Sequence, residues 1–365
     1  MPNKHTLDKP NILVAPLNWG LGHATRCIPI ISALEQHDYV PIIASDGPAL
    51  QLLQKEFPHL QALEFPSYNI EYAADGADFK WQMIKSTPTI IDAMLKEKKI
   101  VKRLVKELDL SGIISDNRLG VSSKKVPSVF MTHQLNVLSG NTTWLSTMLH
   151  QHAISKFDEC WVPDFETKPF LSYKLGHLKN PDSSIKYIGP LSRFTKVEAA
   201  EKYELMVVLS GPEPQRTILE QLLKKEISST GRKSLFIRGI VEEHQHVEDV
   251  ENITYVNYMT SQELETAYNE SALVLCRSGY SSLMDLSRLG KKCFFIPTPG
   301  QYEQEYLAKK LKKEALVPFS KQSDFRIENL LEVDLYKGLP LLENPIEWPK
   351  LFDLFQRERE LRAKA

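Results

Sequence analysis

Short apolar runs that resemble buried strands alternate with longer segments of helical periodicity along most of the 365 residues. In the first half we expect strands near 11–15, 39–44, 60–65, 112–115, 127–132 and 158–162. The clearest helix is predicted over 23–36, where apolar residues from Cys27 to Leu34 recur at helical spacing. This alternation is typical of βαβ units and predicts parallel sheets.

The same pattern starts again in the second half of the chain. Residues 204–210 form a new apolar run, and further strands are expected near 234–238, 253–257, 272–276 and 293–296. Glycine and proline in the segment 188–193 end the first pattern, so we expect a hinge near 190–200. The predicted fold class is α/β, with two Rossmann-like parallel-sheet domains facing across a cleft. Their predicted bounds are 1–192 and 200–345, followed by a helix over 346–365 that is a candidate to pack back on the first domain.

Charge and cysteine usage narrow the class of partner and the compartment. The formal net charge is −1, which gives no overall attraction for nucleic acid. The four cysteines are scattered, as expected for a reducing cytoplasm, and we expect the protein to be cytoplasmic. The Lys-rich run 96–106 leaves open a peripheral contact with the inner face of an anionic membrane, although such a helix surface is more often only solvated.

A glycine loop follows the first predicted strand and opens the first helix. It contains Gly20, Gly22 and His23, but lacks the third glycine and the acidic partner of a dinucleotide fingerprint, which disfavours NAD. A histidine at a helix N-terminus has its charged form disfavoured by the helix dipole. His23 is therefore a candidate proton acceptor, with a capping or packing role as the alternative.

The segment 275–285 brings further chemistry to a strand-to-helix junction. Arg277, Ser278 and Gly279 are expected at a strand's carboxyl end, where the N–H groups of 279–282 would face a diphosphate. Asp285 is expected within reach of a ribose, and its carboxylate could accept hydrogen bonds from the two ribose hydroxyls. The alternative is a solvent-exposed aspartate on the helix surface.

Amides and carboxylates cluster at the next loop-to-helix junction. Gln301, Gln304 and Glu305 suit the recognition of sugar hydroxyls, which both donate and accept. The alternative is an ordinary polar first turn, which is a serious possibility for Glu303.

Three loops of the first half follow apolar strands and would share one edge of a parallel sheet: 115–118, 132–136 and 139–143. Asp116 could be a general base, or it could brace Arg118. The predicted catalytic residues are His23 and Asp116, and the predicted acceptor-binding residues are Asn117, His133 and Asn136.

These segments together resemble the metal-independent, inverting GT-B glycosyltransferases of family 28, the group of the enzyme that adds N-acetylglucosamine to peptidoglycan lipid I. The resemblance rests on Cys276-Arg-Ser-Gly279, an acidic residue at 285, Gly290, and Pro297 leading to Gln304-Glu-Tyr306. It implies that Asp285 holds the ribose, that Gln304 and Glu305 read the donor sugar, and that the loop of Tyr258 and Met259 cradles the uracil. The predicted donor-binding residues are Gly20, Gly22, Gly211, Arg216, Tyr258, Met259, Arg277, Ser278, Gly279, Ser281, Asp285, Gln301, Gln304 and Glu305.

The chain departs from the family pattern at positions that are expected to contact the substrates. Asp285 replaces a glutamate, Glu305 replaces a glutamine, and Gln134 stands where a glutamate is usual. We expect an inverting transfer from a UDP-sugar, N-acetylglucosamine or a related hexose, to a hydroxyl of a cell-envelope glycan or lipid. No cofactor and no metal is expected, since no Asp-x-Asp motif occurs and helix termini can hold a diphosphate. The loop from Gly20 to Cys27 also resembles nucleotide-sugar hydrolases of nonulosonic-acid synthesis, and a sugar epimerase or a non-catalytic binder on the same fold are further alternatives.

Overall fold

The computed structural model describes residues 9–68, 79–137, 143–211, 213–341 and 346–364. Within these residues the first sheet has seven parallel strands in the order β3-β2-β1-β4-β5-β6-β7. The strands are β1 (Asn11–Pro16), β2 (Val40–Ser45), β3 (Ala62–Glu64), β4 (Leu110–Asp116), β5 (Ser128–Met131), β6 (Glu159–Val162) and β7 (Ile185–Tyr187). The helices of this domain are α1 (Leu21–Gln36), α2 (Gly47–Glu56), α3 (Phe79–Glu107) and α4 (Thr143–Ile154).

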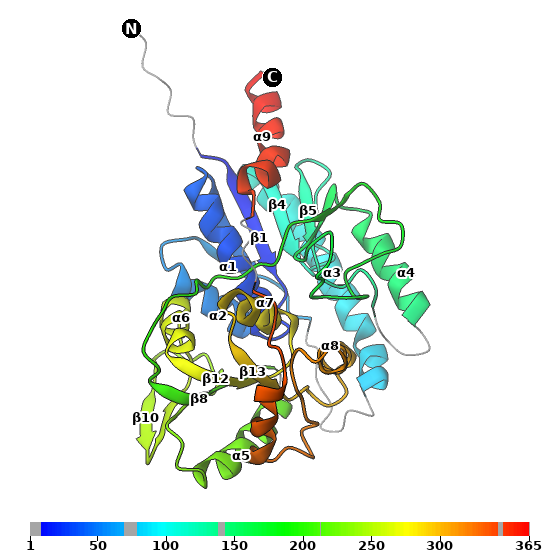
Figure 1. Cartoon of the computed structure of the whole chain (residues 1–365). Coiled ribbons are helices and arrows are strands. Elements are labelled where there is room, and N and C mark those ends of the chain that lie inside the picture. The colour runs from blue at the N-terminus through cyan, green and yellow to red at the C-terminus, as the bar shows by residue number, and fades with distance from the viewer. Residues whose placement is uncertain (1–8, 69–78, 138–142, 212, 342–345, 365) are drawn as a thin grey trace.

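The second sheet has six described strands in the order β10-β11-β9-β8-β12-β13, and lies below the first in Figure 1. The strands are β8 (Tyr203–Val208), β9 (Ser234–Ile237), β10 (Val247–Val250), β11 (Ile253–Val256), β12 (Ser271–Cys276) and β13 (Lys292–Phe295). Its pairs are parallel except for the antiparallel pair of β10 with β11. The helices are α5 (Gln215–Ser228), α6 (Ser261–Asn269), α7 (Tyr280–Leu289), α8 (Tyr302–Lys313), the 3₁₀ helix η3 (Ile327–Leu335) and α9 (Trp348–Lys364).

The predicted α/β class with two Rossmann-like parallel sheets is confirmed, and every strand expected from the sequence has a counterpart. Two further strands, β7 and β10, were not expected from the sequence. The three residues of β7 are only half buried, and all four residues of β10 are exposed. Neither strand therefore carries the apolar run or alternation that marks a buried strand.

The final helix, α9, returns to the first domain and lies beside β4 (Figure 1). Its buried rings pack into that domain, with Phe352 at 5.6 Å from Tyr39 between ring centroids. Gly112 of β4 leaves room for Phe355, because a Cβ there would lie 2.4 Å from Cδ1 of that ring. The last helix thus covers the first sheet after the chain has completed the second.

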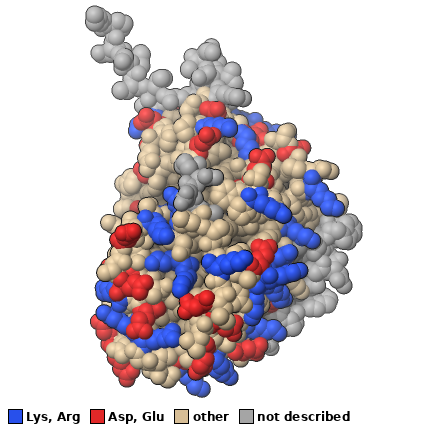
Figure 2. Space-filling view, viewed as in Figure 1, with Lys and Arg blue, Asp and Glu red and all other residues tan. Residues whose placement is uncertain are grey.

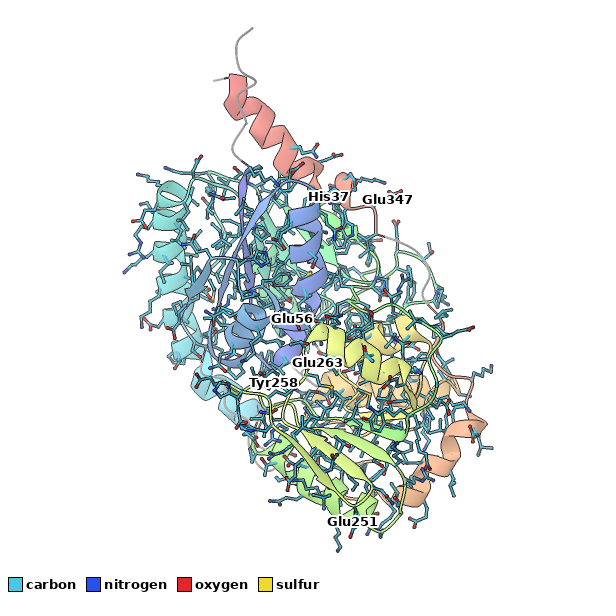
Figure 3. All side chains as sticks on the ribbon, turned by 90° about the vertical axis from the view of Figure 1, so that its left-hand side faces the viewer. His37, Glu56, Glu251, Tyr258, Glu263 and Glu347 are labelled. Atoms are coloured by element: carbon cyan, nitrogen blue, oxygen red, sulfur yellow. The ribbon has the colours of Figure 1, made fainter. Side chains whose placement is uncertain are left out.

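The two domains are joined by apolar and polar contacts. One apolar cluster includes Ile28 of α1 and Leu283 of α7. On another side of the boundary, α2 meets α6, where Oε1 of Glu56 accepts hydrogen bonds of 2.7 Å from both N and Oγ of Ser261. Figure 3 shows Glu56, Tyr258 and Glu263 near each other at this boundary. The two sheets therefore hold a defined relative position.

Both sheets are doubly wound, which places ligand sites at the carboxyl ends of strands where the strand order reverses. That switch point lies between β1 and β4 in the first sheet and between β8 and β12 in the second. Acidic and basic side chains are interspersed on the face shown in Figure 2, in line with the net charge of −1. Within the described residues, no helix is both long and apolar enough to cross a membrane.

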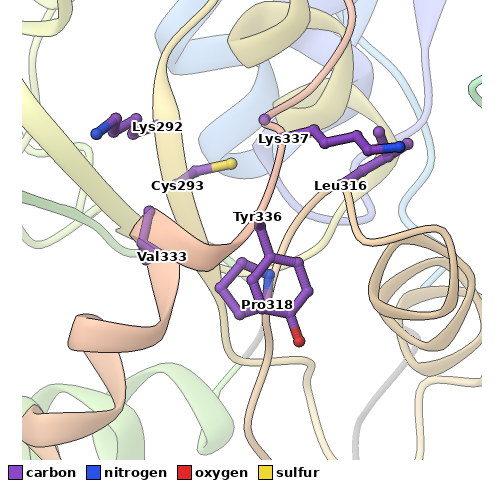
Figure 4. A pocket seen from close by; sticks show the side chains of 8 residues that line it. Lys292, Cys293, Leu316, Pro318, Val333, Tyr336 and Lys337 are labelled. Carbon is purple, nitrogen blue, oxygen red and sulfur yellow. The ribbon is translucent and has the colours of Figure 1, made fainter.

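A small cavity of about 50 Å³ lies at the other end of the second sheet, between the start of β13 and η3 (Figure 4). Its lining includes Lys292, Cys293, Pro318 and Tyr336. It holds little more than one or two water molecules. It is also at the amino end of β13, away from the switch point.

Candidate active site

The first switch point carries a histidine and a carboxylate in direct contact. His23 lies in the first turn of α1, and Asp116 is the last residue of β4. Nδ1 of His23 lies 3.0 Å from Oδ1 of Asp116. The strand ends because Asn117 adopts the left-handed conformation (φ 60°), which asparagine tolerates better than most residues. The two predicted catalytic residues are therefore brought together.

A buried arginine holds the carboxylate from the other side. Nε of Arg26 donates a 2.6 Å hydrogen bond to Oδ2 of Asp116, and its Nη2 also contacts Oδ1. Burial favours the neutral carboxyl, but Arg26 and then His23 outweigh burial and hold the pKa of Asp116 well below its usual range. Asp116 is thus ionised. The sequence analysis did not assign Arg26 a role, although it lies three residues after His23 on the same helix, a spacing that places the two side chains together.

The environment of His23 favours a neutral ring with a defined tautomer. Burial lowers its pKa; Asp116 acts in the opposite direction, and Arg26 adds to the lowering. Nδ1 of His23 lies 3.0 Å from Oδ1 of the ionised Asp116, and Nη2 of Arg26 lies 2.9 Å from the same nitrogen. In the tautomer that Asp116 selects, the proton is on Nδ1. The remaining nitrogen, Nε2, then has a lone pair for a proton, as in other histidine–carboxylate pairs.

His133, predicted to bind the acceptor, belongs to the same network. Its Nδ1 lies 2.8 Å from Nη1 of Arg26, which donates to it. Two residues of the second domain also reach His133. The ring of Tyr280 stacks on it with centroids 4.3 Å apart and planes 2° apart, and Oε1 of Glu303 lies 3.1 Å from its Nε2. His133 therefore lies where the two domains meet.

The two glycine loops also meet across the boundary. Oγ of Ser281 in α7 donates a 2.9 Å hydrogen bond to the carbonyl of Gly22 in α1. A Cβ added at Gly20 or Gly279 would have no neighbour within 4 Å, so there is open space in front of both helix starts. Helix starts of this kind bind anions through free N–H groups.

Two buried polar atoms lie near the second-domain glycine loop without a partner in the described part of the chain. They are Oγ1 of Thr298 and Nε of Arg277. Gly211 has φ 103° and approaches Thr298 closely enough that a Cβ would lie 3.9 Å from that hydroxyl. Buried polar atoms are nearly always hydrogen-bonded, so this pair indicates room for a polar ligand.

Most of the guanidinium of Arg277 is used differently from the prediction. It is buried, and its Nη atoms donate to the carbonyls of Ile296 (3.1 Å), Pro297 (3.2 Å) and Gln215 (2.9 Å). Burial lowers its pKa to about 9. Arg277 therefore clamps three loops in this structure, and only its Nε is left to face an anion. Its role at the diphosphate stays a prediction.

Arg216 also differs from its predicted donor-binding role. It forms a cluster within the second domain, with Nε donating to Glu213 and Nη1 to Glu220, both at 2.6 Å. Its guanidinium is thus satisfied by carboxylates. The sequence could not distinguish this outcome, because an arginine in a first helical turn suits both a phosphate and a neighbouring glutamate.

Asp285 lies against the segment that joins the domains. Its Oδ1 accepts a 2.7 Å hydrogen bond from Oγ of Ser192, and burial raises its pKa to about 6. Gln304 is also buried and braces the neighbouring loop, accepting from N of Thr298 through Oε1 at 2.8 Å. Glu305 accepts from N of Gly300 at 3.2 Å. Their contacts to ribose and sugar remain predictions.

The remaining predicted residues divide between the boundary and the loops. Tyr258 lies under Lys55 of the first domain, with Nζ 5.0 Å from the ring centroid, and Met259 packs beside the apolar cluster. Nδ2 of Asn136 donates to the carbonyls of Lys174 (2.6 Å) and His177 (3.1 Å), so this amide braces a loop. A contact of Asn136 with the acceptor stays a prediction.

Arg118 is paired with Asp46 and, at 2.8 Å, with Glu97, so Asp116 does not brace it. Of the polar run 139–143, residues 139–142 lie outside the described residues. Among the described residues there is no group of three or more His, Cys, Asp or Glu side chains that could hold a metal ion.

Comparison with known proteins agrees with this arrangement. Residues 206–339 match the model of the glycosyltransferase family 28 C-terminal domain. The UDP-N-acetylglucosamine–N-acetylmuramyl-(pentapeptide) pyrophosphoryl-undecaprenol N-acetylglucosamine transferase of Haemophilus ducreyi is 25% identical over 261 residues, 69% of this chain and 70% of that protein.

Solved structures resemble the whole chain. The glycosyltransferase of kitacinnamycin superposes with a TM-score of 0.61 at 13% identity, over 98% of this chain and 96% of the other. MurG of Acinetobacter baumannii gives a TM-score of 0.52 at 15% identity, over 95% and 99%. Both share the two-domain architecture. The chain therefore has the GT-B fold and resembles the glycosyltransferases of family 28, whose C-terminal domain model its residues 206–339 match.

Proposed function

We propose that this protein transfers N-acetylglucosamine from UDP-N-acetylglucosamine to a hydroxyl group of a lipid-linked cell-envelope glycan, with inversion and without a metal ion. The contact of His23 with Asp116, directly opposite the start of α7, carries the proposal. It puts a proton acceptor next to a helix start that suits a diphosphate. The donor and acceptor in the name of the Haemophilus ducreyi relative support the choice of substrates.

The proposed reaction is a single displacement. Nε2 of His23 takes the proton of the acceptor hydroxyl while its oxygen bonds to the anomeric carbon. The bond from that carbon to the phosphate oxygen breaks, and its electron pair leaves with UDP. Asp116 holds the imidazolium that forms, as the carboxylate of a catalytic triad does.

Inversion is supported because the carboxylate of Asp116 is not free to act as a nucleophile. Retention through a covalent intermediate needs a carboxylate free to attack the sugar. Asp116 is buried and accepts from both Arg26 and His23. His23 and Asp116 therefore support direct attack by the activated acceptor better than a covalent intermediate.

The proposal assigns the leaving diphosphate to the second domain. Its donors would be the N–H groups at the start of α7, the Gly211 loop beside Thr298, and the unpartnered Thr298 Oγ1 and Arg277 Nε. Charge-assisted hydrogen bonds of this kind contribute about 1.5–3 kcal/mol each. Such donors can stabilise the charge of the leaving diphosphate in place of a metal ion. We therefore expect chelators to leave the rate unchanged.

The decisive assay measures UDP release from UDP-N-acetylglucosamine with and without a short-chain lipid-linked N-acetylmuramyl-pentapeptide acceptor. Release that depends on the acceptor, with a β-linked product by NMR, supports the proposal. Equal release of UDP and free sugar without acceptor identifies a hydrolase instead. An isomerised donor without free sugar identifies an epimerase.

The rate should depend on pH through His23. The neutral ring is the active form, and burial lowers its pKa, so activity should persist as pH falls below about 6.5, the ordinary value for histidine. The esterified phosphates of a UDP-sugar stay ionised in this range and do not mask the effect. We expect the acid limb of kcat/KM to have its midpoint below 6.5, and a midpoint above 7 would contradict a buried His23 as the base.

A lipid-linked acceptor would bring the protein to a membrane surface, and α3 is the proposed contact. Ile91 and Leu95 are 52% and 54% exposed, and the exposed Lys98 and Lys102 continue the same helix face. Each lysine near an anionic bilayer contributes about 1 kcal/mol of binding.

Binding to phosphatidylglycerol vesicles should therefore weaken at least about tenfold when Lys98 and Lys102 are both changed to Gln. The matched control changes Lys225 and Lys233, two exposed lysines of the second domain, to Gln. Cosedimentation measures both. Equal losses in the two double variants would mean that binding follows total charge rather than α3.

A further inference from the structure

The described residues place a second carboxylate at the acid–base site, and it comes from the other domain. We infer that Glu303 is a positioning residue that enables His23 to accept a proton, and that it does so only while the second domain is docked on the first. This inference rests on the proposed function for its chemistry. Glu303 is in the first turn of α8, and His23 is in the first turn of α1.

The contacts form a continuous path between these two residues. Oε1 of Glu303 lies 3.1 Å from Nε2 of His133, whose Nδ1 accepts from Arg26. Arg26 holds Asp116, and Asp116 holds His23. Nε2 of Gln134 donates to the other oxygen of Glu303 and fixes the carboxylate in place. Arg26, Asp116 and His133 are buried, whereas His23 and Glu303, at the two ends of the path, are partly buried.

Glu303 is not explained as a routine acidic residue of a first helical turn. The dipole of α8 would favour Glu303 and Glu305 alike. Yet the Glu303 side chain is 24% exposed and faces first-domain residues, whereas Glu305 is 38% exposed and lies 3.3 Å from Lys309 of its own helix. Burying a carboxylate is costly unless partners compensate for it. Although burial favours its neutral form, His133 and then Arg26 and His23 lower the pKa of Glu303, so it is ionised.

The charges of the network explain what Glu303 does. While His23 is neutral, Arg26 carries one positive charge, and Asp116 and Glu303 carry one negative charge each. These three groups together then carry a net charge of −1. A proton taken by His23 makes the cluster neutral, which is favourable in a buried site. Without Glu303 the same proton would leave a buried cluster with a net positive charge.

The test compares Glu303→Gln, which keeps the shape and removes the charge, with the wild type. We expect kcat to fall about 10- to 100-fold, the range seen when an outer partner of a reacting group is removed, while KM for the donor stays the same. The acid limb of kcat/KM should move to lower pH, because His23 loses a nearby negative charge. Glu303→Asp keeps the charge and should retain the wild-type acid limb.

Tyr173→Phe is the matched control. It removes another contact between the domains, the 2.7 Å hydrogen bond from Tyr173 to Glu314 near the end of α8, which does not reach His23. Wild-type kcat and acid limb are expected for this variant. A rate loss equal to that of Glu303→Gln, or an acid limb that stays fixed in Glu303→Gln, would overturn the inference.

A second readout needs no activity. NMR titration of ¹³C-labelled histidine, with the His23 signal assigned through His23→Ala, should show a lower pKa of His23 in Glu303→Gln than in the wild type. If the wild type transfers no sugar, the proposed function fails while this titration still tests the role of Glu303. An unchanged His23 titration in Glu303→Gln contradicts the inference even when the enzyme is active.

Discussion

His23→Ala is expected to reduce turnover by about 10²- to 10⁴-fold, the usual contribution of a positioned general base. Nε2 of His23 is the proposed proton acceptor, because in the proposed tautomer Nδ1 donates to Asp116 at 3.0 Å. The diphosphate site belongs to the second domain, so affinity for UDP should remain close to that of the wild type. Steady-state rates and calorimetric titration with UDP measure the two effects separately.

The matched control is His59→Ala. His59 is 60% exposed, lies 2.7 Å from Glu35 and contacts the ring of Phe57, away from the proposed site. It should keep both turnover and UDP affinity. Retained turnover in His23→Ala would exclude His23 as the base. Loss of UDP affinity together with turnover would place His23 in the donor site instead.

Asp116→Asn is expected to lower kcat by about 10³- to 10⁴-fold, as the loss of a carboxylate that fixes the tautomer of a catalytic histidine does. An amide cannot hold Nδ1–H of His23 as an ion does, and it leaves the buried Arg26 without its main counter-charge. Breaking such a buried pair costs about 3–5 kcal/mol of unfolding free energy. Urea denaturation gives this loss beside the kinetic one.

A double variant separates the two losses. Arg26→Gln combined with Asp116→Asn removes both charges, so stability should return most of the way to that of the wild type. Activity should not return, because His23 still lacks its carboxylate. Recovery of activity in the stable double variant would show that Asp116 serves the fold and not the reaction.

Much of the first domain's site could be predicted from the sequence. Parallel strands end at a common edge, so Asp116 after β4 and His23 after β1 could be placed together without coordinates. The same reasoning placed His133 after β5 on that edge. The same reasoning could not show that the amide of Asn136, unlike His133, donates hydrogen bonds to the loop at 174–177.

Contacts between the domains could not be predicted, because strand and helix periodicity says nothing about how two sheets are oriented to each other. Tyr280 and Glu303 reach His133 from the second domain, yet in the sequence they are an apolar helix residue and a first-turn acid. Arg277 shows the converse. Its position at a strand end was predicted, but the three carbonyls it clamps depend on loops from 215 and 296–297.

A crystal structure with bound UDP-N-acetylglucosamine, grown with His23→Ala to prevent turnover, would examine the whole arrangement at once. We predict that the diphosphate lies at the start of α7 beside Gly211 and Thr298, and that the anomeric carbon faces the position of residue 23. A nucleotide sugar bound away from the start of α7, or with its anomeric carbon directed away from Asp116 and residue 23, would contradict the proposed site.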